Sequence, residues 1–539
     1  MRRIPEFPNI GAAFAAAVAK HGPRPFLAVP ADAARSYLPD GLELSYAGAD
    51  AQITALAAIY RAAGYGLGHR VATLLENRPD HVLHKLALNS LGACVVPINP
   101  EYRPGEIAYL LAHSEPELIV TLADRERRIG DALAENAHRP PVALVEAFPA
   151  GVPRARTMPA VGAVTLQTPA CVLYTSGTTG RPKGCVLSHD YELSSGARYA
   201  TLDGVAALRT GQERIYNPLP LYHVNSGTLS LVGAILSGNC QIQAERFHPK
   251  RWWREIAETR ATVVHYLGVI AAMLLNGPPD PEDRAHSIRF GIGAGIEPQL
   301  HRSFEDRFGF PMVEVWGMTE MVRLMADDTE PRQVGTRAFG RAYRGLDVRV
   351  VDDTDRDVAD DQPGEMLVRH SAAIPRRGFF SCYLKDDAAT EAVWRGGWFH
   401  TGDVVRRDAD GMVHFVDRKK NIIRRSGENI AAAEIEALLL THPNVAQAAV
   451  MAVKDEVREE EVLACVVLKR EDPDAALSLF RYCHDHLAYY KTPGWIHILK
   501  TLPTTGTQKI QKHVIYPDNT DPRTALGVVD LRARKRRVE

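Results

Sequence analysis

The sequence predicts an α/β fold with parallel βαβ units in its N-terminal part and a further domain after an inter-domain linker. Two observations support this prediction. Short apolar runs alternate with helical patterns through roughly the first 170 residues, which indicates βαβ units because parallel strands need a crossover helix. A charge-dense segment at 417–425 separates two further apolar patterns, as an inter-domain linker does.

Composition and charge narrow the class of protein. The length of 539 residues favours more than one domain. A formal net charge of −1 provides no field that would recruit nucleic acid or a membrane, and no apolar run approaches the roughly 20 residues that span a bilayer. Seven scattered cysteines without a C-x-x-C pair argue against a disulfide framework or a zinc site and favour a reducing, cytoplasmic compartment.

Both ends of the chain carry basic residues. Glu6 and two prolines follow the N-terminal arginines, so residues 11–20 fit an amphipathic helix better than a signal peptide. The basic run at 532–537 predicts a solvated tail, because blocks of like charge repel one another.

In chain order, apolar runs and helical periodicity place the expected elements. Strands are expected at 70–75, 93–98, 117–121, 170–174, 263–268, 445–453 and 462–468. Helices are expected at 80–91, 104–113, 188–202, 255–262, 270–275, 431–440 and 475–487. The Pro- and Ala-rich residues 139–169 predict a loosely ordered segment.

The segment YTSGTTGRPKG at 174–184 predicts a polyphosphate site. Hydroxyl residues alternate with glycines and Lys183 stands near its end, directly after a buried strand. Glycines let the backbone approach a ligand, and successive amides form a concave donor site for anions. The segment differs from a P-loop because Gly184, not a hydroxyl residue, follows Lys183. An ordinary surface loop is the alternative.

Three later segments offer further polar groups. His223 follows an apolar run, where a lone histidine is more often structural. The glycine-rich residues 289–298 leave backbone open to a flat ring. In VEVWGMTE at 313–320, Trp316 can stack on a base, Thr319 can bond a phosphate and Glu320 can hold Mg²⁺, which prefers hard oxygen ligands; a plain strand-to-turn boundary is the alternative.

The C-terminal third adds a ribose-binding pair and a lysine loop. Asp403 ends a Thr-Gly-Asp turn, where its carboxylate can accept both hydroxyls of a ribose, and Arg418 can donate to the same sugar. Lys509 stands in the hydroxyl-rich segment PTTGTQK at 503–509.

Taken together, YTSGTTGRPKG (174–184), WGMTE (316–320), TGD (401–403), DRKKNIIRRSGENI (417–430) and PTTGTQK (503–509) resemble the motifs of the adenylate-forming, AMP-binding superfamily. This superfamily contains acyl-CoA synthetases, luciferases and peptide-synthetase adenylation domains. The motifs occur in the same order and the resemblance covers nearly the whole chain. Within the superfamily the chain looks most similar to the carnitine/crotonobetaine-type CoA ligases.

The resemblance implies an ATP-dependent acyl-CoA ligase. A carboxylate attacks the α-phosphorus of Mg·ATP to give an acyl-adenylate and diphosphate, and coenzyme A then displaces AMP. It implies a large N-terminal AMP-binding and acyl-substrate domain at 1–416, built from parallel and mixed sheets with flanking helices. It also implies a hinge at 417–421 around Lys420 and a small mobile α+β C-terminal lid at 422–539 that carries the catalytic lysine. Rotation of the lid would let one framework perform both steps.

The resemblance also implies roles for individual residues. Thr175, Ser176, Gly177, Thr178, Thr179, Gly180 and Lys183 would hold the phosphates. Trp316, Gly317 and Met318, with Gly293, Ala294 and Gly295, would surround the adenine, and Asp403 and Arg418 would hold the ribose. Thr319 would bond the α-phosphate, Glu320 the Mg²⁺, and Lys509 would bridge the acyl carboxylate and the phosphate beside His223. Arg425, Ser426, Gly427 and Glu428 would face coenzyme A.

Some positions depart from the family pattern. Gln508 stands where a glycine usually precedes the lysine, and Thr504 where an arginine is common, so Lys512 remains an alternative to Lys509. Gly268 replaces a frequent proline, and Asn421 a frequent acidic residue after the hinge.

The predicted acyl pocket is polar, which favours a small polar or aromatic acid over a long fatty acid. Its expected lining is Tyr222, His223, Asn225, His265, Tyr266, Gly268, Gly293, Met318 and Met321. Arg323 is predicted to reach a second acidic group of the substrate. A free-standing adenylation enzyme that loads a carrier protein and a non-catalytic nucleotide-binding regulator are the alternatives. The acid and the oligomeric state stay open, a homodimer being one option.

Overall fold

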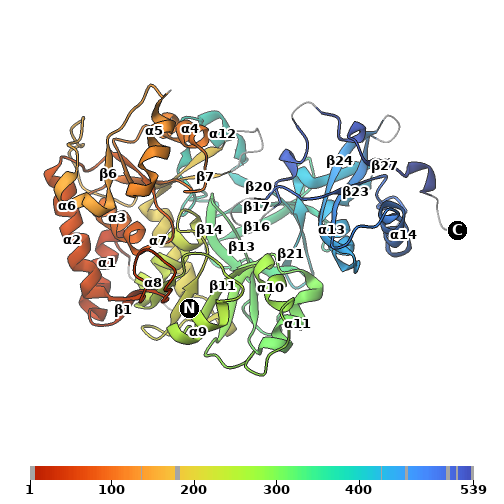
Figure 1. Cartoon of the computed structure of the whole chain (residues 1–539), viewed down its shortest axis with the longest axis horizontal. Coiled ribbons are helices and arrows are strands. Elements are labelled where there is room, and N and C mark those ends of the chain that lie inside the picture. Colours follow the sequence, from red (N-terminus) through yellow and green to blue (C-terminus); the bar gives the residue numbers. More distant parts are fainter. Residues whose placement is uncertain are drawn as a thin grey trace. The chain divides into compact units, whose positions relative to one another are not determined.

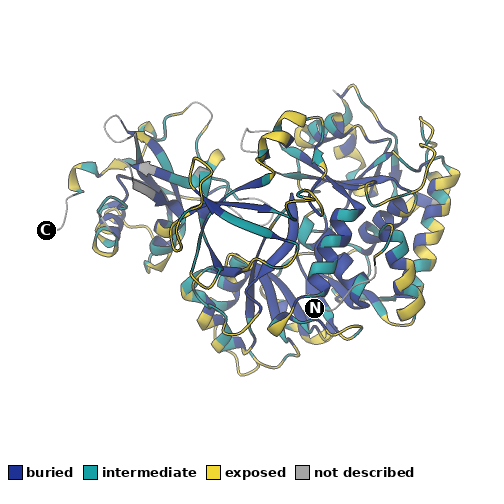
Figure 2. Cartoon of the chain, turned by 180° about the vertical axis from the view of Figure 1, so that it is seen from behind, coloured by how far each residue is buried: buried dark blue, intermediate teal, exposed yellow. Residues whose placement is uncertain are grey.

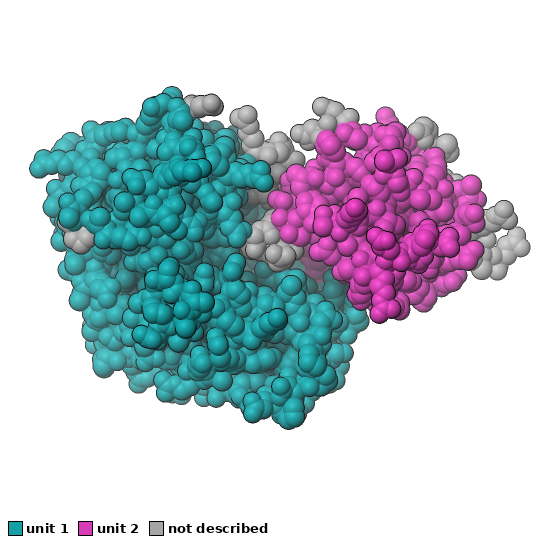
Figure 3. Space-filling view, in the orientation of Figure 1, with its two compact units in different colours: residues 1–347, 369–399 teal, residues 348–368, 400–539 magenta. Residues whose placement is uncertain are grey.

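The computed structural model describes residues 6–134, 136–175, 182–425, 428–455, 459–487, 489–504, 510–517 and 520–535. The chain divides into two compact units (Figure 3). The first contains Met1–Asp347 and Arg369–Phe399, and the second contains Val348–Val368 and His400–Glu539. Two strand-rich segments before residue 417 thus cluster with the C-terminal part of the chain. The domain boundary at 416/417 and the hinge at 417–421 remain predictions.

A seven-stranded sheet in the first unit confirms the predicted βαβ units (Figure 1). Its order is β18 (Cys382–Tyr383), β8 (Lys183–Ser188), β7 (Pro169–Thr175), β4 (Cys94–Pro97), β3 (Arg70–Leu74), β5 (Leu118–Thr121) and β6 (Val142–Leu144). The strands from β7 to β6 are parallel, and β8 runs antiparallel to β7. Helices α4 (Pro104–Ser114) and α5 (Glu126–Ala134) share an apolar cluster with one face.

An eight-stranded sheet forms the other half of this unit. Its order is β14 (Met321–Ala326), β13 (Met312–Met318), β12 (Phe290–Ala294), β11 (Val263–Leu267), β9 (Arg214–Asn217), β10 (Cys240–Gln243), β1 (Pro25–Val29) and β2 (Leu42–Ser45). The two edge strands, β14 and β2, are antiparallel to their neighbours and the six between them are parallel. Helices α9 (Trp252–Thr259), α10 (Gly268–Leu275) and α11 (Pro298–Phe308) pack on one face.

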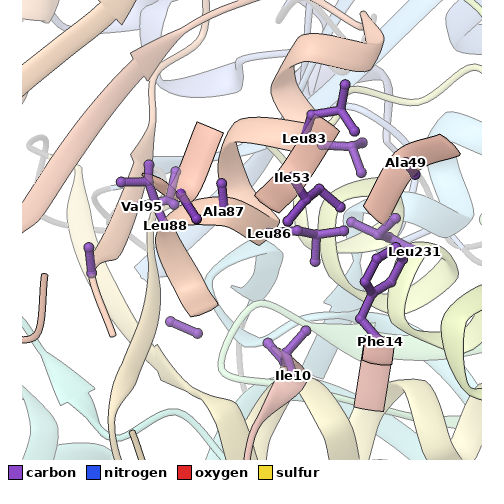
Figure 4. Packing of buried hydrophobic residues seen from close by; sticks show 14 of the residues in the cluster. Ile10, Phe14, Ala49, Ile53, Leu83, Leu86, Ala87, Leu88, Val95 and Leu231 are labelled. Atoms are coloured by element: carbon purple, nitrogen blue, oxygen red, sulfur yellow. The ribbon is translucent and has the colours of Figure 1, made fainter. Parts of the chain in front are cut away.

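A helical layer joins the two sheets. It contains α1 (Ile10–His21), α2 (Tyr46–Ala62), α3 (Pro79–Ser90), α7 (His189–Ala200) and α8 (Leu231–Ser237). Phe14, Ile53 and Leu86 meet in its apolar core (Figure 4), which extends to residues of both sheets. Burial of this apolar surface is the main stabilising contribution to the unit. Strands are largely buried, whereas the outer helices expose one face (Figure 2).

The segment at 139–169 has more structure than its composition predicted. Strand β6 and the short helix α6 (Phe148–Gly151) precede an irregular stretch that leads to β7. Helix α1 confirms the helix predicted at 11–20; the Asn9 side chain caps it by accepting a hydrogen bond from the amide of Ala12. Within the described residues, no helix is both long and apolar enough to cross a membrane.

The second unit contains two groups of strands. Strands β16 (Asp347–Val351), β17 (Gly364–Arg369), β20 (Trp398–Arg407) and β21 (Met412–Arg418) share one sheet. The other sheet contains β22 (Ile422–Arg425), β23 (Glu428–Ala431), β24 (Val445–Asp455), β25 (Glu459–Leu468), β26 (Trp495–Leu499) and β27 (Val528–Asp530). Helices α13 (Ala432–Thr441) and α14 (Ala475–His486) pack with the second sheet around one apolar cluster. The first unit also contains the short elements β15 (Ala338–Arg341), α12 (Asp387–Val393) and β19 (Trp394–Arg395).

The prediction of a solvated basic tail holds for Arg534, which is exposed, but not for the buried side chain of Lys535 and only in part for Arg532. The guanidinium of Arg532 lies 4.1 Å from the ring centroid of Trp495 and 3.0 Å from a carboxylate oxygen of Asp455. Lys535 is buried and its Nζ lies 2.7 Å from Oε1 of Glu461. These opposite charges and the aromatic ring offset the mutual repulsion on which the prediction depended.

Candidate active site

Four parallel strands of the eight-stranded sheet bring predicted site residues to one edge. His223 follows β9, Gly268 follows β11, Gly295 follows β12, and Thr319 follows β13. Because the carboxyl ends of parallel strands meet at the same edge, these residues lie near the crevice where open α/β sheets bind ligands. Ala294, Gly295 and Gly317 are exposed there, although the strands that precede them are buried.

Glycines let two backbone segments approach closely at this edge. A Cβ atom on Gly268 would lie 1.7 Å from the carbonyl oxygen of Gly295, and one on Gly293 would lie 2.2 Å from that of Tyr266. Both distances are shorter than any non-bonded contact allows, so these positions require glycine. The result is a surface made of backbone, which suits a flat ring such as adenine.

Trp316 lies beside this backbone but is itself mostly covered. Its side chain is buried and its ring stacks on Phe339 with centroids 6.2 Å apart. The neighbouring Gly317 is exposed. The predicted contact of Trp316 with adenine remains a prediction.

The Thr319–Glu320 pair forms the turn of a hairpin between β13 and β14, since Met318 pairs with Met321. Tyr383 donates its hydroxyl proton to Oε1 of Glu320 at 2.7 Å, and Tyr191 donates to the carbonyl oxygen of Thr319, also at 2.7 Å. Glu320 is buried. A buried carboxylate oriented by a hydroxyl is a rigid oxygen ligand.

Glu320 fits the Mg²⁺ that the motif implied. Magnesium is usually bound through one or two carboxylates together with substrate phosphates, and not by a complete protein cage. In the part of the chain that the structure describes, no group of three or more His, Cys, Asp or Glu residues could hold a metal ion.

The ends of the predicted phosphate loop are held together by strand pairing. Thr175 ends β7 and Lys183 begins β8, and these two residues are directly opposite each other. Ser176, Gly177, Thr178, Thr179 and Gly180 lie outside the described residues.

Lys183 lies next to the group that orients Glu320. Its Nζ is 5.0 Å from the ring centroid of Tyr383 and 4.0 Å from a carboxylate oxygen of Asp386. Burial and then the charge of Glu320 raise the pKa of Cys185, two residues further along β8. The ammonium of Lys183 and the carboxylate of Glu320 thus adjoin through Tyr383.

His223 and His265 are both neutral around pH 7. His223 is exposed when the whole residue is considered, yet desolvation by the surrounding protein lowers the pKa of its ring to about 4. A group reached by solvent but enclosed by protein atoms is typical of a depression in the surface. His265 is fully buried, and desolvation lowers its pKa to about 3.

The structure corrects the prediction that both His265 and Tyr266 line the acyl pocket. Successive strand residues point to opposite faces of a sheet. Tyr266 points to the face covered by α10 and α11, and donates to Oε1 of Glu314 at 2.7 Å. The same carboxylate accepts from the amide of Gly295 through Oε2 at 3.0 Å. Tyr266 therefore supports the turn after β12 instead of lining a pocket.

The accessible part of the predicted lining is smaller than the sequence suggested. Met321 is fully buried, as are His265 and Tyr266. Solvent reaches Tyr222, His223, Asn225, Gly268 and Met318. The rings of Tyr222 and His223 contact each other, with centroids 4.9 Å apart.

Arg323 is directed towards the segment at 370–378. Its Nη1 lies 2.7 Å from Nδ1 of His370 and 3.4 Å from the carbonyl oxygen of Arg377. Burial, followed by the charges of Arg323 and Arg377, lowers the pKa of His370. Among the described residues no carboxylate forms an ion pair with Arg323. Its contact with a second acidic group of the substrate remains a prediction.

In the second unit, the two predicted ribose ligands pair with each other. Asp403 on β20 lies opposite Arg418 on β21, with Nε of Arg418 2.8 Å from Oδ1 of Asp403. Asp403 is buried, whereas Arg418 is partly exposed. The strand pairing keeps the carboxylate and the guanidinium on the same part of the sheet.

The predicted hinge is a short 3₁₀ turn, Lys419–Asn421. The side chain of Asn421 donates to Oδ1 of Asp417 at 3.1 Å, and the amide of Ala433 donates to Oδ2 of Asp417 at 2.8 Å. Asp417 thereby links the turn to the start of α13. Of Lys420 only the backbone is described.

The predicted coenzyme A face is described only in part. Arg425 is buried and its Nε donates to Oε2 of Glu461 at 2.8 Å. Ser426, Gly427 and the predicted catalytic Lys509 lie outside the described residues, and of Glu428 only the backbone is described. The alternative lysine, Lys512, forms an ion pair with Glu436 at 2.7 Å.

Sequence reasoning missed Tyr383, Tyr191 and Tyr199, which hold site residues in place through their hydroxyl groups. They lie between 63 and 128 positions away from their partners. A tyrosine in an apolar helix or strand carries no local sign of such a bond.

Comparisons with known proteins agree with this geometry. A family model described as AMP-binding enzyme matches residues 14–383, and one described as AMP-binding enzyme C-terminal domain matches residues 434–509. The sulfoacetate–CoA ligase of Cupriavidus necator is 31% identical over 95% of this chain and 98% of its own length. A crotonobetaine/carnitine–CoA ligase of Salmonella paratyphi A is 30% identical over 87% of this chain and 92% of its own length.

Solved structures share the fold. ATP-bound MatB from Rhodopseudomonas palustris has a TM-score of 0.80 at 24% identity, covering 94% of this chain and 98% of that one. O-succinylbenzoate coenzyme A synthetase from Bacillus subtilis in complex with AMP has a TM-score of 0.78 at 23% identity, covering 95% and 99%. The predicted fold class, a large α/β N-terminal part with a small C-terminal domain, is confirmed. The chain belongs to the AMP-binding enzyme family.

Proposed function

We propose that the protein is an AMP-forming ligase that joins a small carboxylic acid to coenzyme A. The acid, ATP and coenzyme A would give the acyl-CoA, AMP and diphosphate through an acyl-adenylate. The observation that carries this proposal is the adjoining set of Lys183, Tyr383 and Glu320 beside the strand-end edge. The relatives that are at least 30% identical are named as CoA ligases, which supports coenzyme A as the acceptor.

In the first step, an oxygen of the substrate carboxylate attacks the α-phosphorus of ATP and diphosphate leaves. Two anions must approach each other, so the site has to supply positive charge and fixed donors. Lys183 would neutralise the departing diphosphate, and Glu320, oriented by Tyr383, would hold Mg²⁺, which supplies further positive charge to the phosphates when it is bound. Thr319 would donate to the α-phosphate.

Lys509 would bridge the carboxylate and the α-phosphate during this step. The ion pair between Lys512 and Glu436 supports that assignment, because an engaged ammonium is less available to substrate. In the second step the thiolate sulfur of coenzyme A attacks the acyl carbonyl carbon and AMP leaves with the bonding electrons. A rotation of the C-terminal domain around Lys420 between the steps would exchange Lys509 for the segment at 425–428.

The acid would be small and polar. The accessible lining contains a phenol, an imidazole and an amide, and two of these are next to each other in the chain. The two relatives are named for sulfoacetate and for crotonobetaine or carnitine, which are short acids with a polar group. A long alkyl chain would leave these polar groups without partners.

A panel of carboxylic acids with diphosphate release as the readout tests the proposal. We expect turnover with short polar acids and formation of the thioester with free coenzyme A in equal amount. Diphosphate release without any thioester would favour loading of a carrier protein. Background ATP–diphosphate exchange across the whole panel would instead favour a regulator that only binds nucleotide.

Substitution of Lys509 separates the two half-reactions. In Lys509→Ala, adenylate formation should fall far more than thioester formation from supplied acyl-adenylate. Lys512→Ala is the matched control and should leave both half-reactions close to wild type. Equal losses of both half-reactions in Lys509→Ala would contradict the domain-rotation account.

A further inference from the structure

A buried network of amide and hydroxyl groups lies beneath the turn that carries His223. Asn225 begins a π-helical turn, Asn225–Ser230, a form that is rare and frequent at functional sites. Its neighbours are buried and polar; the members of the network are Tyr199, Asn217, Asn225, Ser226, Ser230, Gln241, Gln243 and His265. All of them belong to the first unit.

Backbone contacts fix the orientation of the Asn225 amide. The amide N–H of Leu219 donates to Oδ1 of Asn217 at 3.0 Å, so the other end of that side chain must be its NH₂ group. This NH₂ group lies 3.0 Å from Asn225, which must therefore present Oδ1 to it. Because a backbone N–H can only donate, the oxygen and nitrogen positions of both amides follow without ambiguity.

His265 is a second partner of the Asn225 oxygen. Its Nδ1 lies 2.8 Å from Oδ1 of Asn225, and its Nε2 lies 2.7 Å from the hydroxyl of Tyr199. The buried ring is neutral, so one nitrogen donates and the other accepts. Because Oδ1 of Asn225 can only accept, Nδ1–H donates to it, and Nε2 accepts from Tyr199. Two donors therefore converge on the oxygen of Asn225.

Within the described residues, the network binds the oxygen of the Asn225 amide and not its NH₂ group. Asn225 is partly exposed, although the groups that hold its oxygen are buried. Among the residues that the structure describes, no acceptor bonds to its Nδ2. An amide anchored by its oxygen turns its N–H groups away from the network, and Asn225 stands two residues after His223.

We propose that Asn225 is a specificity residue that donates a hydrogen bond to an oxygen atom in the acyl part of the substrate. The substrate class is then a short carboxylic acid with a second oxygen acceptor, such as an ether, hydroxyl, carboxylate or sulfonate oxygen. Acids with an alkyl or cationic group at that point would leave the N–H groups unpaired or repel them. This inference rests on the proposed ligase activity and narrows its substrate.

Tyr199 is the positioning residue in this arrangement. It does not contact the acid, but its hydroxyl bonds Nε2 of His265 and so holds the ring whose Nδ1 contacts Oδ1 of Asn225. Its removal should raise the KM for oxygen-bearing acids while the KM for ATP stays unchanged.

Pairs of acids that differ only by an oxygen in place of a methylene test the proposal. Methoxyacetate is compared with butanoate, and 3-methoxypropanoate with pentanoate, and kcat/KM is followed by diphosphate release. Wild type should prefer the ether in at least one pair by roughly 10- to 100-fold, because a site built to bond an oxygen leaves its donor unpaired with the hydrocarbon. Malonate and sulfoacetate test charged oxygens in the same assay.

Two substitutions at Asn225 should alter that preference. Asn225→Asp keeps an acceptor for Asn217 and His265 but removes the outward donor, so the preference for the ether should disappear and acids with a cationic group should gain. Asn225→Ala should reduce the ratio within each pair to about 1.

Tyr199→Phe should reduce the ratio of kcat/KM between ether and hydrocarbon in part. Asn276→Asp, at an exposed position of the same unit, is the control and should keep the wild-type ratio.

The outcomes separate this inference from the proposed function. Wild-type turnover without a preference for either ether, or an unchanged preference in Asn225→Asp, would overturn the role of Asn225 and leave the ligase proposal intact. Absence of diphosphate release with every acid would overturn the ligase proposal and this inference with it. Loss of turnover in Asn225→Ala together with an unchanged ratio in Tyr199→Phe would also contradict the positioning network.

Discussion

The phosphate side of the site and its acyl side are built from different kinds of groups. Around Lys183 and Glu320 a full positive and a full negative charge adjoin through Tyr383. Around His223 and Asn225 the groups are neutral, because desolvation lowers the pKa of His223 to about 4 and that of His265 to about 3. The orientation of hydrogen bonds, instead of charge, distinguishes this second side.

This difference assigns two tasks to the two sides. In the proposed reaction, the charged groups would act on the phosphates, which are the same in every reaction cycle, so a change there should affect all acids equally. The oriented neutral donors would act on the acyl group, which differs between acids, so a change there should affect acids unequally. The predictions below test this division.

The largest effect is expected for Glu320→Gln, which removes the carboxylate for the metal while keeping the size of the side chain. Adenylate formation should fall by about 10²- to 10³-fold for every acid of the panel, because a preorganised electrostatic contribution to the transition state is lost. ATP–diphosphate exchange measures it. Asp386→Asn, next to Lys183 but not at the metal position, is the control. A loss of adenylate formation with only some of the acids would contradict the proposal that the charged groups act on the phosphates and the neutral groups on the acyl group.

The second-largest effect, a loss of kcat/KM for the acids, is expected for Gly268→Ala. The added Cβ would lie 1.7 Å from the carbonyl oxygen of Gly295, so the backbone after β11 or β12 must move. Displacement of substrate by about 1 Å can cost roughly 10²-fold in rate, and we expect kcat/KM for the acids to fall by that order.

The size of the Gly268→Ala effect should vary between acids, because the acyl side is where the backbone moves. Gly105→Ala provides the control, since a Cβ on Gly105 meets nothing within 4 Å. Circular dichroism and thermal melts show whether both variants are folded. Full activity of Gly268→Ala with all acids would mean that the edge of the sheet is not part of the site.

A smaller effect is expected for Tyr383→Phe, which removes the hydroxyl that orients Glu320. Hydrogen bonds to charged groups contribute about 1.5–3 kcal/mol, or roughly 10- to 100-fold. Adenylate formation should fall within that range for all acids, and more Mg²⁺ should be needed for half-maximal rate. Tyr109→Phe, in which the lost hydroxyl bonds a backbone carbonyl at Pro182 instead, is the control. An unchanged Mg²⁺ requirement would contradict the role of Tyr383.

The smallest effect concerns pH and stability. The pKa of His265 falls from the usual 6.5 to about 3 in the folded chain, so the unfolded chain binds an additional proton below pH 6.5. The contribution of His265 to stability is therefore complete above pH 6.5 and is lost as the pH falls towards 3. Between pH 7 and pH 5, wild type should lose about 2 kcal/mol more than His265→Gln.

Denaturant unfolding of wild type and His265→Gln at both pH values measures this difference. His513→Gln, at an exposed position, should follow wild type. If wild type and His265→Gln lose the same free energy of unfolding between pH 7 and pH 5, the ring of His265 is not buried in a neutral state.

The charged side of the site was largely predictable from sequence, and the neutral side was not. Lys183 and Glu320 stand in segments whose composition already indicates phosphate and metal chemistry. The direction of the Asn225 amide depends on Asn217, His265 and the backbone of Leu219, which are brought together only by the fold. The sequence shows that residue 225 is an asparagine, but it does not show which way the side-chain amide is turned.

Two errors of prediction have similar physical causes. His265 and Tyr266 were both expected in the lining of one pocket, although the two-residue period of a strand sends them to opposite faces. The basic tail was expected in solvent because of its charge, whereas Glu461 and Asp455 in distant strands compensate Lys535 and Arg532. In both cases the decisive partner is distant along the chain. The strands and helices themselves were predictable because their periodicity is local.

The transfer of oxygen from the acid to AMP tests the central claim most directly. If the carboxylate attacks the α-phosphorus, one carboxylate oxygen leaves with the nucleotide when coenzyme A displaces it. With an accepted acid labelled with ¹⁸O at both carboxylate oxygens, mass spectrometry of the products should find one ¹⁸O in AMP and one in the thioester. Unlabelled AMP, or ADP with ¹⁸O in released phosphate, would contradict an acyl-adenylate and with it the proposed roles of both sides of the site.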